Sequence, residues 1–175
     1  MRSVRQKRQD RGGLLVSSQQ GRVDTKKVSP QAQLPIRLVD QLCFSVYAAS
    51  RALIGVYRDL LKDSDLTYPQ YIVMIALWEQ DRIKISELCQ SVCLDYGTLT
   101  PLLKRLELRG VLLRSRDPQD ERVVRLIVTD AGWQLQKKVA GAPHKLRYKI
   151  SLSRDETTKI RLTMKTLIQD LKAEA

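Results

Sequence analysis

Several features that catalysis or membrane insertion would need are missing from this chain. One residue of 175 is histidine, His144, which removes the commonest general base and any histidine-rich metal site. No glycine-rich phosphate loop and no zinc-site spacing occur. No window approaches the roughly 20 apolar residues of a spanning helix, and the short run 14–16 is no signal-peptide core. We therefore expect a cytoplasmic protein with no membrane-spanning segment, no metal and no cofactor, and not an enzyme.

Cysteine is also scarce, with three residues that follow no framework of spacings. An odd number without an export signal indicates free thiols in a reducing compartment, where any disulfide would be regulatory. Cys89 and Cys93 are four residues apart but lack two further metal ligands, so we expect both to pack beneath the neighbouring helices. For Cys43 the residues alone leave two interpretations open, a reactive sensor or a small buried hydrophobe.

Charge is abundant and predominantly of one sign. Thirty-one Lys and Arg against 19 Asp and Glu give a net charge of +12, which favours a polyanionic partner, either nucleic acid or an anionic membrane surface. Half of this excess falls within residues 1–34, a segment with almost no apolar periodicity. We predict a basic, disordered tail over 1–34 and a folded domain over 35–175.

Apolar periodicity predicts a long amphipathic helix over residues 38–60, with apolar side chains at alternating steps of four and three. Thr67 and Gln70 have the spacing of a capping box ahead of a second, more buried helix. On the first helix a second stripe includes the thiol and two phenols; its members are Cys43, Tyr47, Ser50, Ile54 and Tyr57.

The middle of the chain has the pattern of a DNA-reading unit. Ser86 and Asp95 are suitable caps for two short helices, the second of which stops at Gly110, and two short helices joined by a tight turn are typical of a helix-turn-helix. The strand-like runs 111–116 and 122–129 flank a turn rich in Pro and acidic residues, which predicts a hairpin wing. The fold class is therefore mainly α with a small β-hairpin.

The C-terminal part is predicted to be helical. Thr129 begins one helix, which Pro143 interrupts, and Ser153 with Glu156 forms a second capping box. The apolar residues between 160 and 171 then lie on one stripe, which needs a partner.

Four segments together resemble the MarR family of regulators, specifically its organic hydroperoxide resistance regulator branch. The reader and wing resemble the broad family, whereas Cys43 followed by Tyr47, Tyr57 and Tyr68 resembles the peroxide-sensing branch. The resemblance covers residues 36–172 and rests on Leu42-Cys43-Phe44 with Tyr47, on 66–71, on 94–107 and on 116–122.

The resemblance implies a homodimeric winged helix-turn-helix repressor with N- and C-terminal dimerisation helices and a near-palindromic double-stranded DNA operator. Arg122 in the wing would reach into the minor groove, with Asp120 orienting it. We interpret Arg105 and Arg109 as ordinary solvated charges on the outer face of the helix. Tyr96 stands where this branch usually has a small serine, so no operator preference is carried over. The reader residues implied to lie near bases or phosphates are Tyr96, Thr98, Thr100 and Lys104.

The resemblance also implies that Cys43 attacks an organic hydroperoxide and becomes a sulfenic acid. Tyr57 and Tyr68 match tyrosines that hydrogen-bond the reactive thiol across the dimer, and Tyr47 matches a third that responds to oxidation. No cysteine follows Cys93, so the C-terminal resolving cysteine of two-cysteine members is missing. The expected outcome is a mixed disulfide with a small cellular thiol, or overoxidation, with release of DNA.

Three alternatives remain open. A MarR-type repressor could be released by a non-covalently bound effector such as a phenolic compound, with Cys43 as pocket lining. A small thiol peroxidase is disfavoured by the missing resolving cysteine and histidine machinery. A nonspecific architectural binder would fit the charge of +12, but not the helix-turn-helix and wing.

Overall fold

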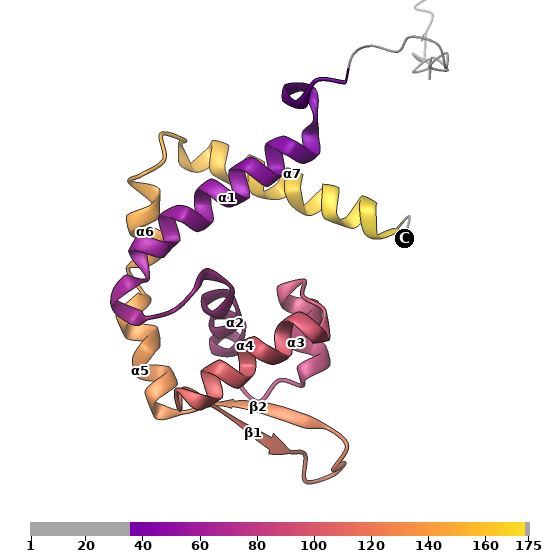
Figure 1. Ribbon diagram of the computed structural model, residues 1–175, viewed down its shortest axis with the longest axis vertical. Helices are drawn as coiled ribbons and strands as arrows, with labels where there is room; N and C mark the ends of the chain where they lie inside the picture. Colours follow the sequence, from indigo (N-terminus) through magenta and orange to yellow (C-terminus); the bar gives the residue numbers. More distant parts are fainter. Residues whose placement is uncertain (1–35, 174–175) are drawn as a thin grey trace, which may run out of the picture. The chain divides into compact units, whose positions relative to one another are not determined.

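The computed structural model describes residues 36–173, so the predicted tail over 1–34 lies outside the described residues. Helices and one antiparallel hairpin follow one another along the chain (Figure 1). Their order is η1 (Leu38–Asp40), α1 (Leu42–Leu60), η2 (Lys62–Ser64), α2 (Tyr68–Glu79), α3 (Ile85–Val92), α4 (Tyr96–Leu108), β1 (Leu112–Arg116), β2 (Val124–Val128), α5 (Asp130–Val139), α6 (Ala142–Arg147) and α7 (Arg154–Ala173).

Local side-chain caps start several of these helices. Before α2, the Thr67 amide donates to Gln70 Oε1 at 2.9 Å and the Gln70 amide donates to Thr67 Oγ1 at 3.4 Å, which confirms the first predicted capping box. Before α7, the Ser153 amide donates to Glu156 Oε2 at 2.8 Å, and the Glu156 amide donates back to Ser153 Oγ. These contacts span three residues, which is why the sequence alone indicates them.

Some predicted boundaries were wrong. The helix α3 begins at Ile85, one residue before the predicted cap Ser86. Pro143 does not interrupt a helix; it lies in the first turn of α6, after α5 has already ended at Val139. A proline is tolerated in a first helical turn because its missing N–H would have no intrahelical partner there.

The hydrophobic core lies within the helix-turn-helix and wing. In the hairpin, Leu112 pairs with Val128 and Arg114 pairs with Leu126, and the leucines of these pairs are fully buried. By contrast, none of the described residues of α1 or α7 is buried. The fully buried side chains come from α2, α3, α4, the hairpin and the residue that follows α1: Leu61, Val73, Met74, Leu77, Leu88, Leu99, Leu103, Leu106, Leu112 and Leu126.

Gly132 marks the closest approach of α5 to the hairpin. A Cβ at this position would clash with the Val111 carbonyl and lie 2.7 Å from Val128 Cγ1. Trp78 Nε1 also donates to the Gly132 carbonyl at 3.1 Å, which restricts any backbone shift. We expect Gly132→Ala to lower the free energy of unfolding by about 1–3 kcal/mol, measured by urea denaturation.

The matched control is Gly141→Ala, since a Cβ there would meet nothing nearer than Lys145 Cε at 3.9 Å. Equal stability of the two variants would contradict the close approach.

Across residues 36–173, no helix combines the length and apolar composition that crossing a membrane requires.

Candidate nucleic-acid interface and thiol site

The helix α4 presents the predicted reader residues in its first three turns. Asp95 caps the helix by accepting from the Thr98 amide at 2.8 Å and from Thr98 Oγ1 at 2.7 Å. These hydrogen bonds from Thr98 lower the pKa of Asp95 below its usual range. Thr100 Oγ1 donates to the Tyr96 carbonyl at 2.8 Å. The two threonine protons are therefore used within the helix, and the hydroxyl oxygens keep acceptor capacity.

Tyr96 and Lys104 are exposed on the same helix, and the Tyr96 side chain is 60% exposed. An exposed phenol at a helix start and an ammonium two turns later suit base edges and phosphates. The predicted reader residues are thus brought together on α4, with Thr98 engaged in capping as well.

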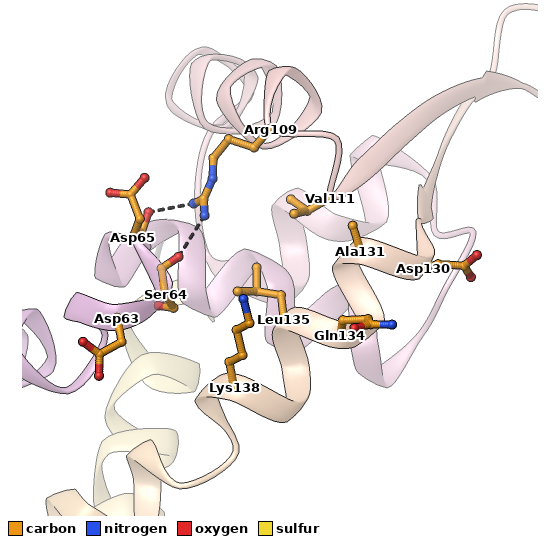
Figure 2. Close-up of a pocket in the computed structure, with 10 residues that line it drawn as sticks. All are labelled: Asp63, Ser64, Asp65, Arg109, Val111, Asp130, Ala131, Gln134, Leu135 and Lys138. Atoms are coloured by element: carbon orange, nitrogen blue, oxygen red, sulfur yellow. Dashed lines mark hydrogen bonds between the residues drawn. The ribbon is translucent and has the colours of Figure 1, made fainter.

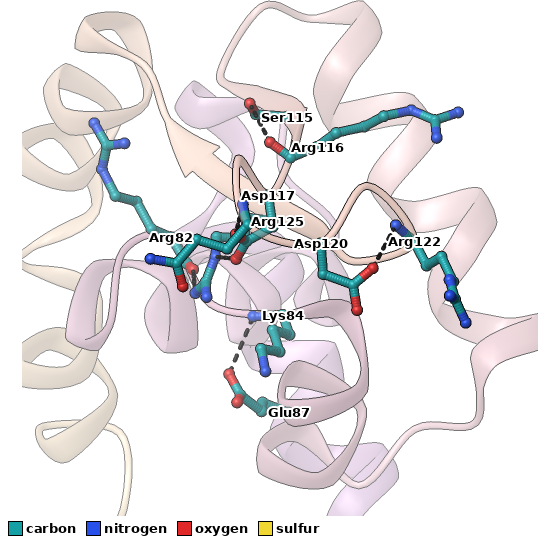
Figure 3. Close-up of polar contacts among 10 residues, drawn as sticks. Arg82, Lys84, Glu87, Ser115, Arg116, Asp117, Asp120, Arg122 and Arg125 are labelled. Carbon is teal, nitrogen blue, oxygen red and sulfur yellow. Dashed lines mark hydrogen bonds and ion pairs between the residues drawn. The ribbon is translucent and has the colours of Figure 1, made fainter.

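The wing places Arg122 at an exposed position in the turn between β1 and β2. Asp120 Oδ1 accepts from the backbone amide of Arg122 at 3.0 Å, not from its guanidinium (Figure 3). The structure thus joins Asp120 to Arg122 through the backbone, and the prediction that Asp120 orients Arg122 toward the minor groove stays a prediction. Asp120 shapes the turn, as short carboxylates commonly do by bonding an amide two residues on.

A pair that the sequence reasoning missed anchors this wing. Arg125 Nε lies 2.5 Å from Asp117 Oδ2, and Arg125 Nη1 donates to the Arg82 carbonyl at 3.0 Å (Figure 3). Asp117 is buried and also accepts from the Gln119 amide; this bond and the Arg125 guanidinium lower the pKa of Asp117. The end of the hairpin next to its turn is thereby tied to the loop before α3.

Two further polar residues face the same surface. Lys84 and Ser86, at the start of α3, line a hollow of about 230 Å³ together with Tyr96 and Arg122. The hollow therefore joins the start of α3, the start of α4 and the wing. Two cationic side chains and two hydroxyls around one concavity suit a phosphate oxygen. The sequence signal for Lys84 and Ser86 was their place at the first helix of the predicted helix-turn-helix.

Cys43 lies exposed on α1 in an open, mostly apolar hollow of about 660 Å³. The hollow lies between α1 and α7, with Tyr47 on one side and Leu167 and Leu171 on the other. The Arg51 guanidinium lies 5.7 Å from the centre of the Tyr47 ring. The structure thus brings Cys43 and Tyr47 together, in a setting that a lipophilic molecule can enter.

Tyr57 and Tyr68 lie together elsewhere, in a cluster with Tyr71. The centre of the Tyr57 ring lies 4.9 Å from the centre of the Tyr68 ring and 5.5 Å from that of the Tyr71 ring. Burial, and then the neighbouring phenols, raises the pKa of Tyr57 to about 12, so this phenol stays protonated near neutral pH. Cys43 is 14 residues from Tyr57 on one continuous helix, about 21 Å at 1.5 Å per residue. Within one chain, the thiol and these phenols are therefore not in contact.

The other two cysteines differ from each other. Cys89 is partly buried against the core, as predicted, but Cys93 is exposed, so the prediction that both pack beneath the helices was wrong for Cys93. Cys93 ends α3 in a left-handed conformation with φ of 54°, which turns it out of the helix. Its Sγ lies 3.9 Å from Lys172 Nζ. Among the described residues, no group of His, Cys, Asp or Glu could hold a metal ion.

Apolar side chains remain uncovered along α1 and α7. They belong to the stripes predicted at both ends of the domain, and each is at least 40% exposed. Isolated exposed apolar residues are ordinary, but a row along two long helices indicates a contact surface. The side chains are Leu42, Tyr47, Leu53, Ile160, Ile168 and Leu171.

Comparisons with known proteins agree with this architecture. A family model described as the transcriptional regulator SarA/Rot matches residues 56–139. The HTH-type transcriptional regulator TtmR of Methylorubrum extorquens is 41% identical over 91% of this chain and 77% of its own length. The organic hydroperoxide resistance transcriptional regulator of Bacillus subtilis is 35% identical over 78% of this chain and 92% of its own length.

Solved structures give the same result. Reduced AbfR bound to DNA is 36% identical, with a TM-score of 0.65 over 77% of this chain and 94% of that one. Overoxidised AbfR bound to DNA is 35% identical, with a TM-score of 0.65 over 77% of this chain and 95% of that one.

The fold and these matches define a winged helix-turn-helix DNA-binding transcriptional regulator rather than an enzyme. The chain belongs to the MarR/SarA family of transcriptional regulators.

Proposed function

We propose that this chain is a homodimeric repressor that releases operator DNA when an organic hydroperoxide oxidises Cys43. The observation that carries the proposal is the position of the thiol: Cys43 is exposed, in an apolar hollow, on a helix none of whose residues is buried among the described residues. Relatives at 35–36% identity include an organic hydroperoxide resistance regulator and AbfR, which has been crystallised in reduced and overoxidised forms.

Dimerisation would cover the apolar residues of α1 and α7. A twofold axis makes the same patch meet itself, and it presents two copies of α4 to DNA. Two readers related by a twofold axis match a near-palindromic operator, with half-sites about one helical turn, 34–36 Å, apart. The exposed cationic residues Lys104 and Arg122 would supply part of the attraction to phosphates.

The dimer would also bring the phenols to the thiol. Cys43 lies near the start of α1 and Tyr57 near its end, so two α1 helices packed antiparallel would place each thiol beside the partner subunit's Tyr57. Tyr68 contacts Tyr57 and would enter the same site. Because the pKa of Tyr57 is raised to about 12, its O–H is available to donate a hydrogen bond to a thiolate.

The chemistry is a two-electron oxidation followed by a condensation. The Cys43 thiolate attacks the terminal peroxide oxygen, the O–O bond breaks, and the products are the sulfenate and the alcohol. The protonated sulfenic acid then reacts with a small cellular thiol, forming a mixed disulfide and releasing water. The hydroperoxide is reduced and Cys43 is oxidised, and a cellular thiol later restores the protein by exchange.

The mixed disulfide is the form we expect to release DNA. It adds a bulky group within an apolar interface, which could move the two readers out of register with their half-sites. Overoxidised AbfR was crystallised bound to DNA, so overoxidation does not by itself prevent binding in that relative. We therefore assign release to the mixed disulfide and not to overoxidation.

The test is binding of the purified protein to the DNA upstream of its own gene, before and after stoichiometric cumene hydroperoxide with a small thiol. Wild type should lose binding and regain it with reductant, whereas Cys43→Ser should stay bound. Cys93→Ser, which removes the other exposed thiol, is the matched control and should respond like wild type.

If Cys43→Ser and wild type respond identically, the thiol is not the sensor. Release of both proteins by a phenolic compound would then favour a non-covalent effector. A hollow of about 450 Å³ between α2 and α5, lined by Tyr71, Ile75 and Trp78 among others, has the composition to accept one.

A further inference from the structure

Arg109 joins the end of the reading helix to a segment 44 residues earlier in the chain. Its Nη1 donates to the Asp65 carbonyl at 2.6 Å and its Nη2 donates to the Ser64 carbonyl at 2.8 Å (Figure 2). Two nitrogens of one planar guanidinium thus hold two consecutive carbonyls, a geometry that lysine cannot reproduce. The interpretation of Arg109 as a solvated charge was therefore wrong.

The carbonyls belong to the short segment that leads out of α1. Ser64 closes η2, and its buried hydroxyl donates to the Leu61 carbonyl at 2.6 Å, which ties η2 to the last turn of α1. Asp65 then turns the chain with a left-handed φ of 52°. Carbonyls at the end of a helical turn lack partners further along the helix and carry partial negative charge, so they attract a guanidinium.

On the other side, Arg109 is rigidly continuous with α4. Its amide donates to the Arg105 carbonyl at 3.1 Å, so it completes the helix. Gly110 follows with a left-handed φ of 68°. The Thr129 hydroxyl donates a hydrogen bond to the Gly110 carbonyl at 2.6 Å. The end of α4 is therefore fixed between η2 and the start of α5.

We propose that Arg109 is a positioning residue for DNA recognition, which sets the angle of α4 relative to α1 and thereby the spacing of the two reading helices in the dimer. The proposal rests on the dimeric DNA binding of the proposed function and is independent of Cys43. Arg109 acts through the backbone of η2 and makes no contact with DNA in this scheme.

Because α4 is long, a small rotation at one of its ends displaces the other end considerably. The helix α4 has 13 residues, about 20 Å at 1.5 Å per residue. A rotation of about 10° at its C-terminal end would move its N-terminal end by about 3.4 Å, the rise of one base pair. In this scheme, the two hydrogen bonds oppose such a rotation, and the buried side chains Leu99, Leu103 and Leu106 keep α4 in the core when the bonds are lost.

The experiment compares Arg109→Gln and Arg109→Lys with wild type on two duplexes. The first is a near-palindrome that wild type selects from a random pool, and the second has one base pair inserted at its centre. Lys138→Gln is the matched control, because Lys138 lines the same cavity beside Arg109 but its removal leaves both carbonyl contacts in place (Figure 2).

We expect Arg109→Gln to bind the selected duplex about five- to twentyfold more weakly, with a much smaller loss on the inserted duplex, so that spacing preference falls. Arg109→Lys should be intermediate and Lys138→Gln should match wild type. The slope of log Kd against log salt should stay unchanged for Arg109→Gln, whereas Arg122→Gln should reduce it by about one.

Equal loss on both duplexes would overturn the proposal, because it would mean that Arg109 serves only the stability of the fold. A reduced salt slope for Arg109→Gln would overturn it in favour of a phosphate contact. Unchanged binding would show that the two hydrogen bonds from Arg109 have no effect on DNA recognition. A monomeric wild type without spacing preference would overturn it too, and sedimentation would identify that case as a failure of the dimer itself.

Discussion

The double variant Ile160→Asp/Ile168→Asp should be monomeric and should bind a two-half-site duplex at least about a hundredfold more weakly than wild type. Both side chains are 48% exposed on α7, whose described residues include none that is buried. Two carboxylates in an apolar contact surface would lose their hydration on association, which strongly disfavours the dimer. A monomer has one reading helix α4 in place of two. It therefore loses the high effective concentration at the second half-site that binding of the first half-site gives to a dimer.

The winged helix itself should survive these substitutions, because its buried core lies between Leu61 and Ala142 and includes no residue of α7. Thr166→Asp is the matched control, since Thr166 lies on the opposite side of α7 from the stripe that contains Ile160 and Ile168. Sedimentation equilibrium and titration of the duplex are the two measurements. A dimeric double variant with wild-type affinity would refute α7 as the dimer surface.

Local structure could be predicted from the sequence wherever the cause lies within a few residues. The Thr67 and Gln70 capping box, the Asp95 cap and the hairpin were all predicted, because each depends on residue types three to ten positions apart. The burial of Cys93 was predicted wrongly, because its outward turn depends on a left-handed backbone at the end of α3. Cysteine is a rare residue in that conformation, so nothing in the pattern indicated it.

Long-range contacts could not be predicted in this way. Arg109 and its carbonyls are 44 and 45 residues apart, and carbonyls carry no residue type that a sequence pattern could reveal. Arg125 and Asp117 stand eight residues apart across the hairpin, but both also suit a solvated wing. Only the register of β1 and β2, with the α2–α3 loop against it, brings the pair together.

The thiol site was predictable in its parts but not in its arrangement. Cys43 and Tyr57 share one helical stripe in sequence, yet the rise of the helix separates them by about 21 Å. The hollow at Cys43 is instead completed by α7, more than 120 residues later. A stripe of residues on one helix therefore defines a face, whereas a site requires that a second element meet it.

A further large effect is expected at the phenols. In Tyr57→Phe/Tyr68→Phe the partner subunit's thiolate would lose two hydrogen-bond donors, so sulfenic acid formation should slow by about ten- to hundredfold. The rings and their packing at 4.9 Å would remain, so the fold and reduced DNA binding should not change. Stopped-flow measurement of thiol loss with cumene hydroperoxide gives the rate. Tyr71→Phe, in the same cluster, is the matched control.

Mixed dimers distinguish a site shared between subunits from one within a chain. A Cys43→Ser chain with intact tyrosines is paired with a Tyr57→Phe/Tyr68→Phe chain that keeps Cys43. If the phenols act across the dimer, the remaining thiol faces Tyr57 and Tyr68 of the other chain and reacts at the wild-type rate. If they act within one chain, it faces phenylalanines and stays slow. The separation of about 21 Å along α1 requires the first result, and a slow mixed dimer would contradict a thiol site shared between the two subunits.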